Sequence, residues 1–231
     1  MVGFSKEEEK IYLANLMQVN EQLQSQLELD DVDSIQVLAM MTKLRQICCE
    51  ARMVYQNIDT PSTKLEVCVD LIQTLKENGK KVLLFSSFTK IFDWLEIELD
   101  KKGIKYHKLT GATSKEQRKK EVEQFQTDDS DVFLISLKAG GTGLNLTEAS
   151  AVIHFDPWWN SSAQSQATDR AYRIGQNKNV LVYQLMMKNS IEEKIHEMQK
   201  RKREMSDLFV ENSGPRISKM SAEDLRELFT L

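Results

Sequence analysis

Short apolar runs alternate with helical periodicity through the middle of the chain, and this alternation predicts an α/β fold. The runs that we interpret as strands are residues 82–85, 104–109, 132–135, 151–155 and 180–187. The stretches between them carry apolar residues three or four positions apart, which is typical of helices that bury one face. Short continuous apolar strands separated by helices indicate a parallel sheet that is covered on both sides. The sequence therefore predicts a parallel sheet flanked by helices.

The first part of the chain, before this sheet, is predicted to be helical. Apolar residues recur at helical spacing from residue 11 to residue 27, and a polar break follows at residues 30–34. Asp33 or Ser34 is a candidate N-cap for a second helix, which is predicted to continue through Tyr55. We treat residues 1–60 as a helical lead-in.

The sheet domain is predicted to span residues 61–189, and the remainder of the chain is again helical. Ser190 and Glu193 have the spacing of a capping box at the start of a helix that is predicted to reach Val210. A break at residues 214–215 and a short acidic helix over residues 221–229 follow. We treat residues 190–231 as a C-terminal helix with its tail.

Composition narrows the classes of function. The chain has 231 residues, of which 41% are hydrophobic and 29% charged, as in soluble globular proteins. Its formal net charge is −4, so any contact with nucleic acid must use a local basic strip. No apolar run reaches the roughly 18 residues of a membrane span, so we expect no membrane partner. The three cysteines are odd in number and lack C-x-x-C spacing, so we expect neither a disulfide framework nor a metal site.

The glycine-rich loop that follows the run at 132–135 is the densest candidate for chemistry. Gly140, Gly141 and Gly143 lie within four positions, and Lys138 precedes them. Without a Cβ, glycine lets a backbone approach a phosphate closely and offer it N–H groups. A tight turn between a strand and a helix is an equal alternative for the glycines, and Lys138 favours the phosphate.

A second candidate is a stripe of polar residues on the predicted helix over residues 161–174. Gln166, Arg170 and Arg173 are spaced to share one helix face, and two guanidinium groups on one face can bind one anion together. A solvated basic stripe, or a structural pair with Asp169, is the alternative and is favoured for two arginines taken alone.

Three further loops carry polar or aromatic groups after predicted strands. Ser87 ends one strand, and its alternative role is to cap the next helix. Thr110 and Gly111 precede a helix that carries Arg118 one turn in, where a phosphate cradle and a plain capped helix are both open. Trp159 follows another strand and can pack internally or wedge into a groove.

The chain lacks a nucleotide cradle of its own. No G-x-x-x-x-G-K-[ST] loop occurs, and no Asp-Glu pair that could hold magnesium follows an apolar run. It therefore combines candidate anion-binding arginines with no evident phosphate loop.

Taken in this order, the loops resemble the second RecA-like lobe of superfamily 2 helicase-like motors, above all the Swi/Snf class of DNA translocases and chromatin-remodelling ATPases. The resemblance covers roughly residues 42–210. Residues 84–89 resemble motif IV, 109–118 the next DNA-contacting motif, 136–146 motif V and 166–176 motif VI. The string D-R-A-Y-R-I-G-Q at residues 169–176 is the most specific element.

The resemblance implies a role for each matched residue. Arg170 and Arg173 match the arginines that reach ATP phosphates bound on the other lobe, with Arg173 as the arginine finger, and Gln166 matches a glutamine at the same interface. The positions implied near the nucleotide are Gly141, Gly143 and Asn145. The positions implied to contact DNA are Ser87, Thr110, Gly111, Arg118, Lys138, Gly140 and Trp159.

The same resemblance implies the cofactor and the partners. ATP with Mg²⁺ would be held mainly by an N-terminal RecA-like lobe of the same parent protein, and this lobe and double-stranded DNA would be the partners of the chain. The chain alone would then be inactive. The short, insert-free spacing between the motifs suggests a bacterial member and hence a cytoplasmic protein, with a nuclear location as the alternative for a eukaryotic source. Two other functions remain open: a DNA-binding module with no role in hydrolysis, and a metabolic enzyme whose glycine-rich loop holds a small phosphate ligand.

Overall fold

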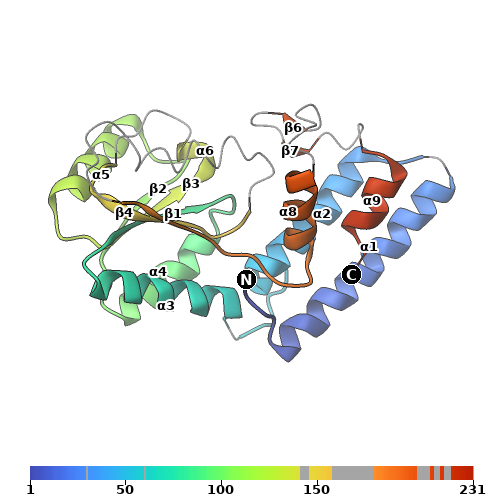
Figure 1. Cartoon of the computed structure of the whole chain (residues 1–231), viewed down its shortest axis with the longest axis horizontal. Coiled ribbons are helices and arrows are strands. Elements are labelled where there is room, and N and C mark those ends of the chain that lie inside the picture. The colour runs from blue at the N-terminus through green and yellow to red at the C-terminus, as the bar shows by residue number, and fades with distance from the viewer. Residues whose placement is uncertain are drawn as a thin grey trace. The chain divides into compact units, whose positions relative to one another are not determined.

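The chain forms two compact units. The structure is a computed structural model that describes residues 1–29, 31–59, 61–140, 146–157, 179–201, 209–210, 214–215 and 220–230. Residues 65–185 form one unit, here called the α/β unit. Residues 1–64 and 186–231 together form the other, here called the helical unit. In the sequence, the α/β unit is thus an insertion within the helical unit (Figure 1).

The α/β unit contains the predicted parallel sheet. Its five described strands are β1 (Lys81–Ser86), β2 (Tyr106–Leu109), β3 (Val132–Ser136), β4 (Ala149–His154) and β5 (Leu181–Gln184). They are ordered β2-β3-β1-β4-β5, and every neighbouring pair is parallel. In the register, Phe85 of β1 is paired with Ile135 of β3 and with His154 of β4. The prediction of a parallel α/β fold is confirmed.

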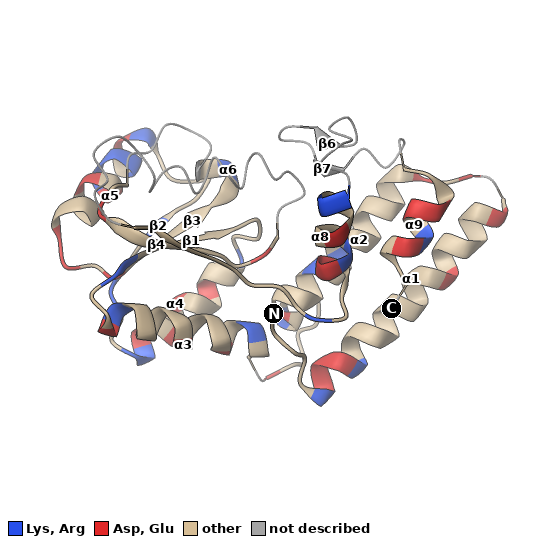
Figure 2. Ribbon diagram, viewed as in Figure 1, with Lys and Arg blue, Asp and Glu red and all other residues tan. Residues whose placement is uncertain are grey.

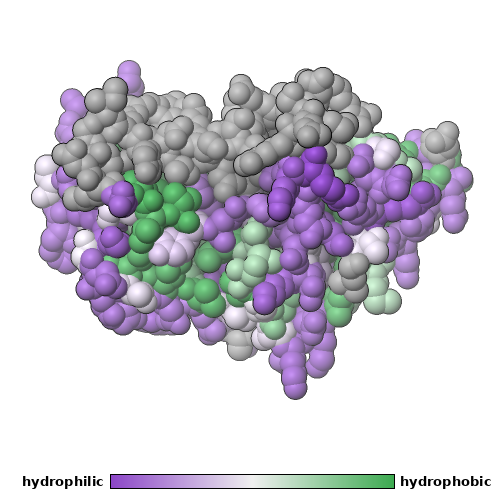
Figure 3. Space-filling model, viewed as in Figure 1, coloured by the Kyte–Doolittle hydropathy of each residue, from purple (hydrophilic) through white to green (hydrophobic). Residues whose placement is uncertain are grey.

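Burial explains which strands the sequence showed clearly. β1, β3 and β4 lie inside the sheet, and nearly all of their residues are buried, which is why they appear as continuous apolar runs. The edge strand β5 begins with Leu181 and Val182, which are 39% and 49% exposed. Figure 3 shows hydrophobic side chains at the surface of the α/β unit, whereas hydrophilic side chains cover most of the visible face of the helical unit.

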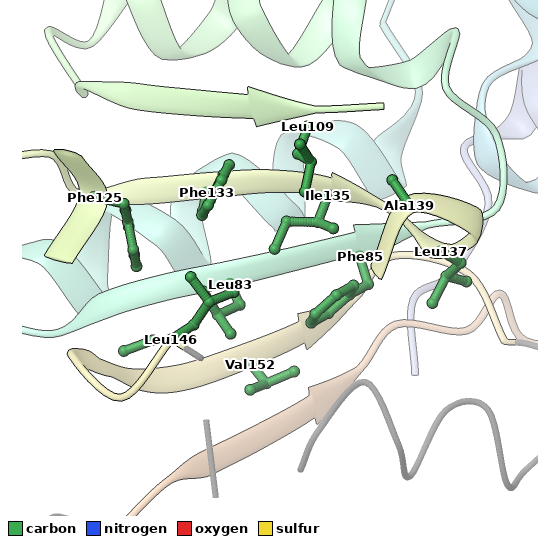
Figure 4. Packing of buried hydrophobic residues seen from close by; sticks show 11 residues of the cluster. Leu83, Phe85, Leu109, Phe125, Phe133, Ile135, Leu137, Ala139, Leu146 and Val152 are labelled. Atoms are coloured by element: carbon green, nitrogen blue, oxygen red, sulfur yellow. The ribbon is translucent and has the colours of Figure 1, made fainter. Parts of the chain in front are cut away.

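Helices connect the strands and complete the core of the α/β unit. They are α3 (Thr63–Glu77), α4 (Ile91–Lys101), α5 (Lys115–Thr127) and the short α6 (Leu137–Gly140). The first two residues of α3, Thr63 and Lys64, belong to the helical unit. Figure 1 shows α3 and α4 on one face of the sheet, and Figure 2 shows the charged residues of α5. The buried cluster in Figure 4 combines sheet residues such as Phe85 and Phe133 with Phe125 of α5 and Leu137 and Ala139 of α6. This packing fixes α6 at the end of β3.

Two glycines end helices where the sequence predicted helix stops. Gly79 follows α3 with φ of +66°, and Gly103 follows α4 with φ of +61°. A side chain disfavours this left-handed conformation, so glycine is the preferred residue just beyond a helix. At the N-terminal end of α5, the hydroxyl of the N-cap residue Ser114 accepts a hydrogen bond from the Gln117 N–H at 3.2 Å.

The helical unit is built from both ends of the sequence. Its described elements are α1 (Lys6–Glu28), α2 (Ser34–Cys49), the 3-10 turn η1 (Ala51–Met53), α8 (Ile191–Arg201), the two-residue strands β6 (Phe209–Val210) and β7 (Gly214–Pro215), and α9 (Ala222–Leu228). Asp33, one of the two predicted caps, accepts hydrogen bonds from the N–H groups of Ile35 and Gln36 and so begins α2. Val2 also forms a parallel bridge with Met187, which joins the two parts of this unit.

A buried ion pair joins the same two parts of the helical unit. The Lys64 ammonium donates to both carboxylate oxygens of Glu192, at 2.7 and 2.6 Å, and both side chains are fully buried. The Glu192 carboxylate also accepts the Met187 N–H at 2.9 Å. Tyr12 of α1 lies in the same region, where its hydroxyl accepts the Ile191 N–H at 2.7 Å.

Two predicted helix ends in this unit are wrong. The second helix stops at Cys49 instead of Tyr55, because Glu50 is extended and its carboxylate accepts the N–H of Ser62 at 3.1 Å. At the C-terminal end, Phe209–Val210 pairs in antiparallel fashion with Gly214–Pro215, so these residues are not the end of a helix. Phenylalanine and valine favour strands, and proline cannot continue a helix, which agrees with the observed pairing.

The expected capping box at the start of α8 is also rearranged. The Ser190 hydroxyl accepts the N–H of Glu192 at 3.2 Å, and the Glu193 carboxylate accepts the N–H of Asn189 at 2.7 Å instead of that of Ser190. Ser190 and Glu193 thus still accept hydrogen bonds from backbone N–H groups at the start of α8, but each accepts from the residue one position before the one expected. None of the described helices is both long enough and apolar enough to span a membrane.

The buried histidine in the middle of the sheet gives a testable pH dependence. Burial lowers the pKa of His154 from 6.5 to about 4, so the folded α/β unit holds this ring neutral. The unfolded chain binds the proton more readily than the folded chain does. The contribution of neutral His154 to the free energy of unfolding is therefore fully present above pH 6.5 and is lost as the pH falls towards 4. The shift corresponds to roughly 3 kcal/mol.

Urea unfolding followed by tryptophan fluorescence measures this effect. All three tryptophans (Trp94, Trp158 and Trp159) belong to the α/β unit. We expect His154→Leu to flatten the dependence between pH 6.5 and 4, and His196→Leu, in the helical unit, to leave it unchanged. An unaltered slope in His154→Leu would contradict the assignment.

Candidate functional site

The carboxyl ends of β1, β2 and β3 open onto a pocket of about 430 Å³ within the α/β unit. It is lined by Ser87, Thr89, Lys90, Asp93, Lys108, Thr110, Gly111, Ala112, Ser136 and Lys138. Ligands of parallel sheets bind at this edge, because the loops that follow the strands converge there. Four of the residues predicted from the sequence to contact DNA meet in this pocket: Ser87, Thr110, Gly111 and Lys138.

The loop after β2 is closed by its own threonines and leaves Gly111 at the surface. The Thr113 hydroxyl accepts the Thr110 N–H at 3.0 Å, and the Thr110 hydroxyl accepts the Ala112 N–H at 3.3 Å. A Cβ added at Gly111 would meet no atom within 4 Å, so packing within this chain does not demand glycine there. Its small size instead leaves the backbone open to a ligand in the pocket.

The loop after β1 is tied to the end of β4 by a buried carboxylate. Asp156, which is 1% exposed, accepts hydrogen bonds from the Ser86 hydroxyl at 2.7 Å, from the Ser87 N–H at 3.0 Å and from the Ser87 hydroxyl. A hydroxyl has one proton to donate. Donation from Ser87 to a phosphate therefore requires its hydroxyl to rotate away from Asp156, and the predicted DNA contact of Ser87 stays a prediction.

Arg118 supports the loop after β3. Its guanidinium donates to the carbonyl oxygen of Ala139 at 3.0 Å, near the end of α6. The Ser136 hydroxyl accepts the Ala139 N–H at 3.3 Å at the start of the same turn. These contacts hold α6 so that Lys138 is exposed at the pocket. A direct DNA contact of Arg118 stays a prediction, and Gly140 is the last residue of α6.

Lysines outnumber carboxylates in the lining of the pocket. Lys108 is paired with Glu96 at 2.5 Å, and Asp93 adds a negative charge. Lys90 and Lys138 are exposed, and neither belongs to an ion pair among the described residues. Sequence reasoning missed Lys90, although its place directly after the polar end of β1 could have indicated it. Cations and hydroxyls around an open pocket fit the oxygens of phosphate groups.

A second group of charges fixes α5 beside the pocket. The ring of His107 on β2 contacts the carboxylates of Glu121 at 2.5 Å and Asp128 at 2.8 Å. Desolvation raises the pKa of Asp128, but hydrogen bonds from Ser130 and His107 outweigh it and lower the pKa to about 2. This carboxylate therefore stays charged at neutral pH and holds the end of α5 to the sheet.

The other predicted site residues lie outside the described residues. These are Gly141, Gly143, Asn145, Trp159, Gln166, Arg170 and Arg173. Within the part of the chain that the structure describes, no three His, Cys, Asp or Glu side chains are grouped to hold a metal ion. The described pocket thus fits phosphate oxygens, and it offers no carboxylate cluster that would fit Mg²⁺.

Comparison with known proteins agrees with the resemblance seen in the motifs. Residues 63–175 match the family described as the helicase conserved C-terminal domain. The chain is 37% identical over 201 residues to the putative ATP-dependent helicase/translocase YwqA of Bacillus subtilis, a match that covers 84% of this chain and 22% of that protein. The chain spans about a fifth of the length of the curated relatives that it matches.

Solved structures extend the likeness to almost the whole chain. The C-terminal domain of a Sulfolobus solfataricus SWI2/SNF2 ATPase is 25% identical with a TM-score of 0.78, over 98% of this chain and 94% of that one. The core of a SWI2/SNF2 ATPase from the same organism, in complex with double-stranded DNA, is 28% identical with a TM-score of 0.80. That match covers 98% of this chain and 48% of the core.

Proposed function

This chain belongs to the Swi2/Snf2 class of helicase C-terminal domains, and on that premise we propose that it is the second motor lobe of an ATP-dependent translocase on double-stranded DNA. The observation that carries the proposal is the pocket at the carboxyl ends of β1, β2 and β3. Residues that the motifs singled out separately, above all Lys138, Thr110 and Gly111, line one cavity there.

The pocket is suited to hold one stretch of DNA backbone. Lys138 and Lys90 supply positive charge, and the surface position of Gly111 lets a phosphate approach the loop backbone. Phosphate contacts of this kind fix the place of a protein on a duplex without reading its sequence. Such a grip suits a motor that moves along DNA of any sequence.

We propose that hydrolysis needs a first lobe that holds ATP and Mg²⁺. The described residues contain no carboxylate cluster for the metal, and the sequence has no G-x-x-x-x-G-K-[ST] loop. ATP held by the first lobe would supply the terminal phosphoryl group, which water would attack with ADP as the leaving group. The part of this chain is then to bring Arg170 and Arg173 to the phosphates, where positive charge stabilises the transition state. Gln166, Gly141, Gly143 and Asn145 would line the same cleft.

A DNA-binding module with no role in hydrolysis is the alternative. The described pocket favours this alternative only in that its lysines and hydroxyls fit phosphate binding. The two functions differ in what the loss of Arg173 does to the rate of ATP hydrolysis.

Replacing Lys138 by alanine tests the DNA-binding part of the proposal. We expect roughly tenfold weaker binding to a short DNA duplex near 0.1 M salt, because one phosphate contact is lost. The slope of log affinity against log salt concentration should fall by about 1. Fluorescence anisotropy of a labelled duplex measures both quantities.

A matched variant separates this effect from a general loss of positive charge. Lys119 on α5 is exposed, is paired only loosely with Glu123 at 3.7 Å, and does not line the pocket. Lys119→Ala removes the same charge and should leave the salt slope unchanged. Equal losses in the two variants would mean that the pocket is not the place of contact.

A further inference from the structure

The carboxylate of Asp156 accepts three hydrogen bonds at the point where the pairing of two neighbouring strands ends. The backbone pairing of β1 and β4 extends to the Phe155 N–H, which donates to the Phe85 carbonyl oxygen at 2.9 Å. Beyond that bond the strands separate, and the side chain of Asp156 continues the connection. Its two oxygens accept from the Ser86 hydroxyl, the Ser87 N–H and the Ser87 hydroxyl.

A chain of hydrogen bonds connects Asp156 through Ser86 and Phe88 to the start of α4. While the Ser86 hydroxyl donates to Asp156, its oxygen accepts the Phe88 N–H at 3.1 Å. The Phe88 carbonyl oxygen then accepts the Ile91 N–H at 3.2 Å in the first turn of the helix. Asp156 thereby orients the short segment 87–90, from which Ser87, Thr89 and Lys90 line the pocket.

The charge of Asp156 is itself unfavourable at such a place. A buried carboxylate close to a pocket for phosphate groups repels them, so charge alone predicts that its removal would strengthen DNA binding. The hydrogen bonds predict weaker DNA binding instead, because loss of the Asp156 carboxylate releases the segment that carries Lys90. The two effects differ in sign, and this makes the role of Asp156 measurable.

We infer that Asp156 is a positioning residue, whose buried carboxylate holds the segment 87–90 in the arrangement that binds a DNA phosphate. The inference rests on the proposed function of the pocket. Lys90 is the cation that this segment contributes, and its ammonium is the group that would contact the phosphate.

A double-mutant cycle on the intact protein tests the inference. An asparagine at position 156 keeps the size of the side chain but has one acceptor oxygen for three donors. We expect Asp156→Asn to bind a short duplex roughly tenfold more weakly near 0.1 M salt, the effect of one lost phosphate contact. Lys90→Ala should have the same effect, and the double variant should be no weaker than either single variant.

Lys138 provides the independent arm of the cycle, because it lies on α6 and not on the segment 87–90. The losses from Asp156→Asn and Lys138→Ala should therefore multiply, to roughly a hundredfold. If Asp156→Asn binds as tightly as the unchanged protein or more tightly, or if its loss multiplies with that of Lys90→Ala, the inference is wrong. If Lys138→Ala alone has no effect, the proposed function fails instead.

Ser86→Ala keeps the test available if Asp156→Asn does not fold. Ser86 is buried in β1 and is not among the residues that line the pocket, so its loss removes one donor to Asp156 without touching the ligand site. We expect roughly threefold weaker DNA binding that does not add to the loss from Lys90→Ala. Unchanged binding in a folded Ser86→Ala protein would overturn the inference.

Discussion

Replacing Arg173 by alanine, in a protein that joins this chain to its first lobe, is expected to lower kcat for DNA-stimulated ATP hydrolysis by roughly 10³–10⁵-fold. A guanidinium that contacts the phosphates only as charge develops lowers the barrier of the chemical step, so kcat falls more than the affinity for ATP. Steady-state hydrolysis at saturating duplex DNA measures the effect. Arg226→Ala, an exposed arginine on α9, removes the same charge elsewhere and should leave kcat unchanged.

Two outcomes would contradict the motor assignment. If hydrolysis persists at the original rate in Arg173→Ala while DNA binding is weaker, the chain is a binding module. The chain of 231 residues alone should hydrolyse no ATP, because its sequence contains no G-x-x-x-x-G-K-[ST] loop. Turnover by this chain alone would remove the need for a first lobe.

Replacing Glu192 by alanine is expected to lower the free energy of unfolding of the helical unit by about 3–5 kcal/mol. The substitution leaves the fully buried Lys64 ammonium without the carboxylate that it contacts at 2.6 and 2.7 Å. Desolvation lowers the pKa of Lys64, but Glu192 outweighs it and raises the pKa above its usual value, so the pair is charged. The helical unit contains no tryptophan, so urea unfolding followed by far-UV circular dichroism is the suitable measurement.

Two companion variants show whether the loss comes from the buried charge. Glu193→Ala, on the same helix, removes a carboxylate that is only partly buried and accepts the Asn189 N–H, and it should cost only about 1 kcal/mol. Replacing both members of the pair, as in Lys64→Met with Glu192→Leu, should recover much of the loss, because no unpaired charge remains inside. A small effect of Glu192→Ala would mean that Lys64 finds another partner or water.

Local sequence pattern was enough to predict the sheet. β1, β3 and β4 are buried on both faces, so each is a continuous apolar run that needs no information from the rest of the chain. The end of α2 could not be predicted in this way. Glu50 leaves the helix because Ser62 donates to its carboxylate, and a helical pattern does not record so distant a partner.

Some residues of the candidate site could likewise be predicted from local sequence pattern, and others could not. Lys138, Thr110 and Gly111 were recognisable because each lies within three positions of the end of an apolar run, and parallel strands bring such positions to one edge. The sequence pattern predicted no role for Asp156. Its partner Ser86 is 70 positions away, and only the pairing of β1 with β4 brings the two together. Residue spacing alone therefore misses the groups that hold the pocket in shape.

The insertion of one unit within the other has a consequence for synthesis on the ribosome. Lys64 leaves the exit tunnel 128 residues before Glu192, and the whole α/β unit is made in between. The sheet can therefore fold while α1 and α2 still lack α8 and while the Lys64 ammonium remains in water. Nascent chains arrested when residue 185 has just left the exit tunnel should show protease resistance in the α/β unit alone, and the helical unit should gain protection only after its last segment emerges.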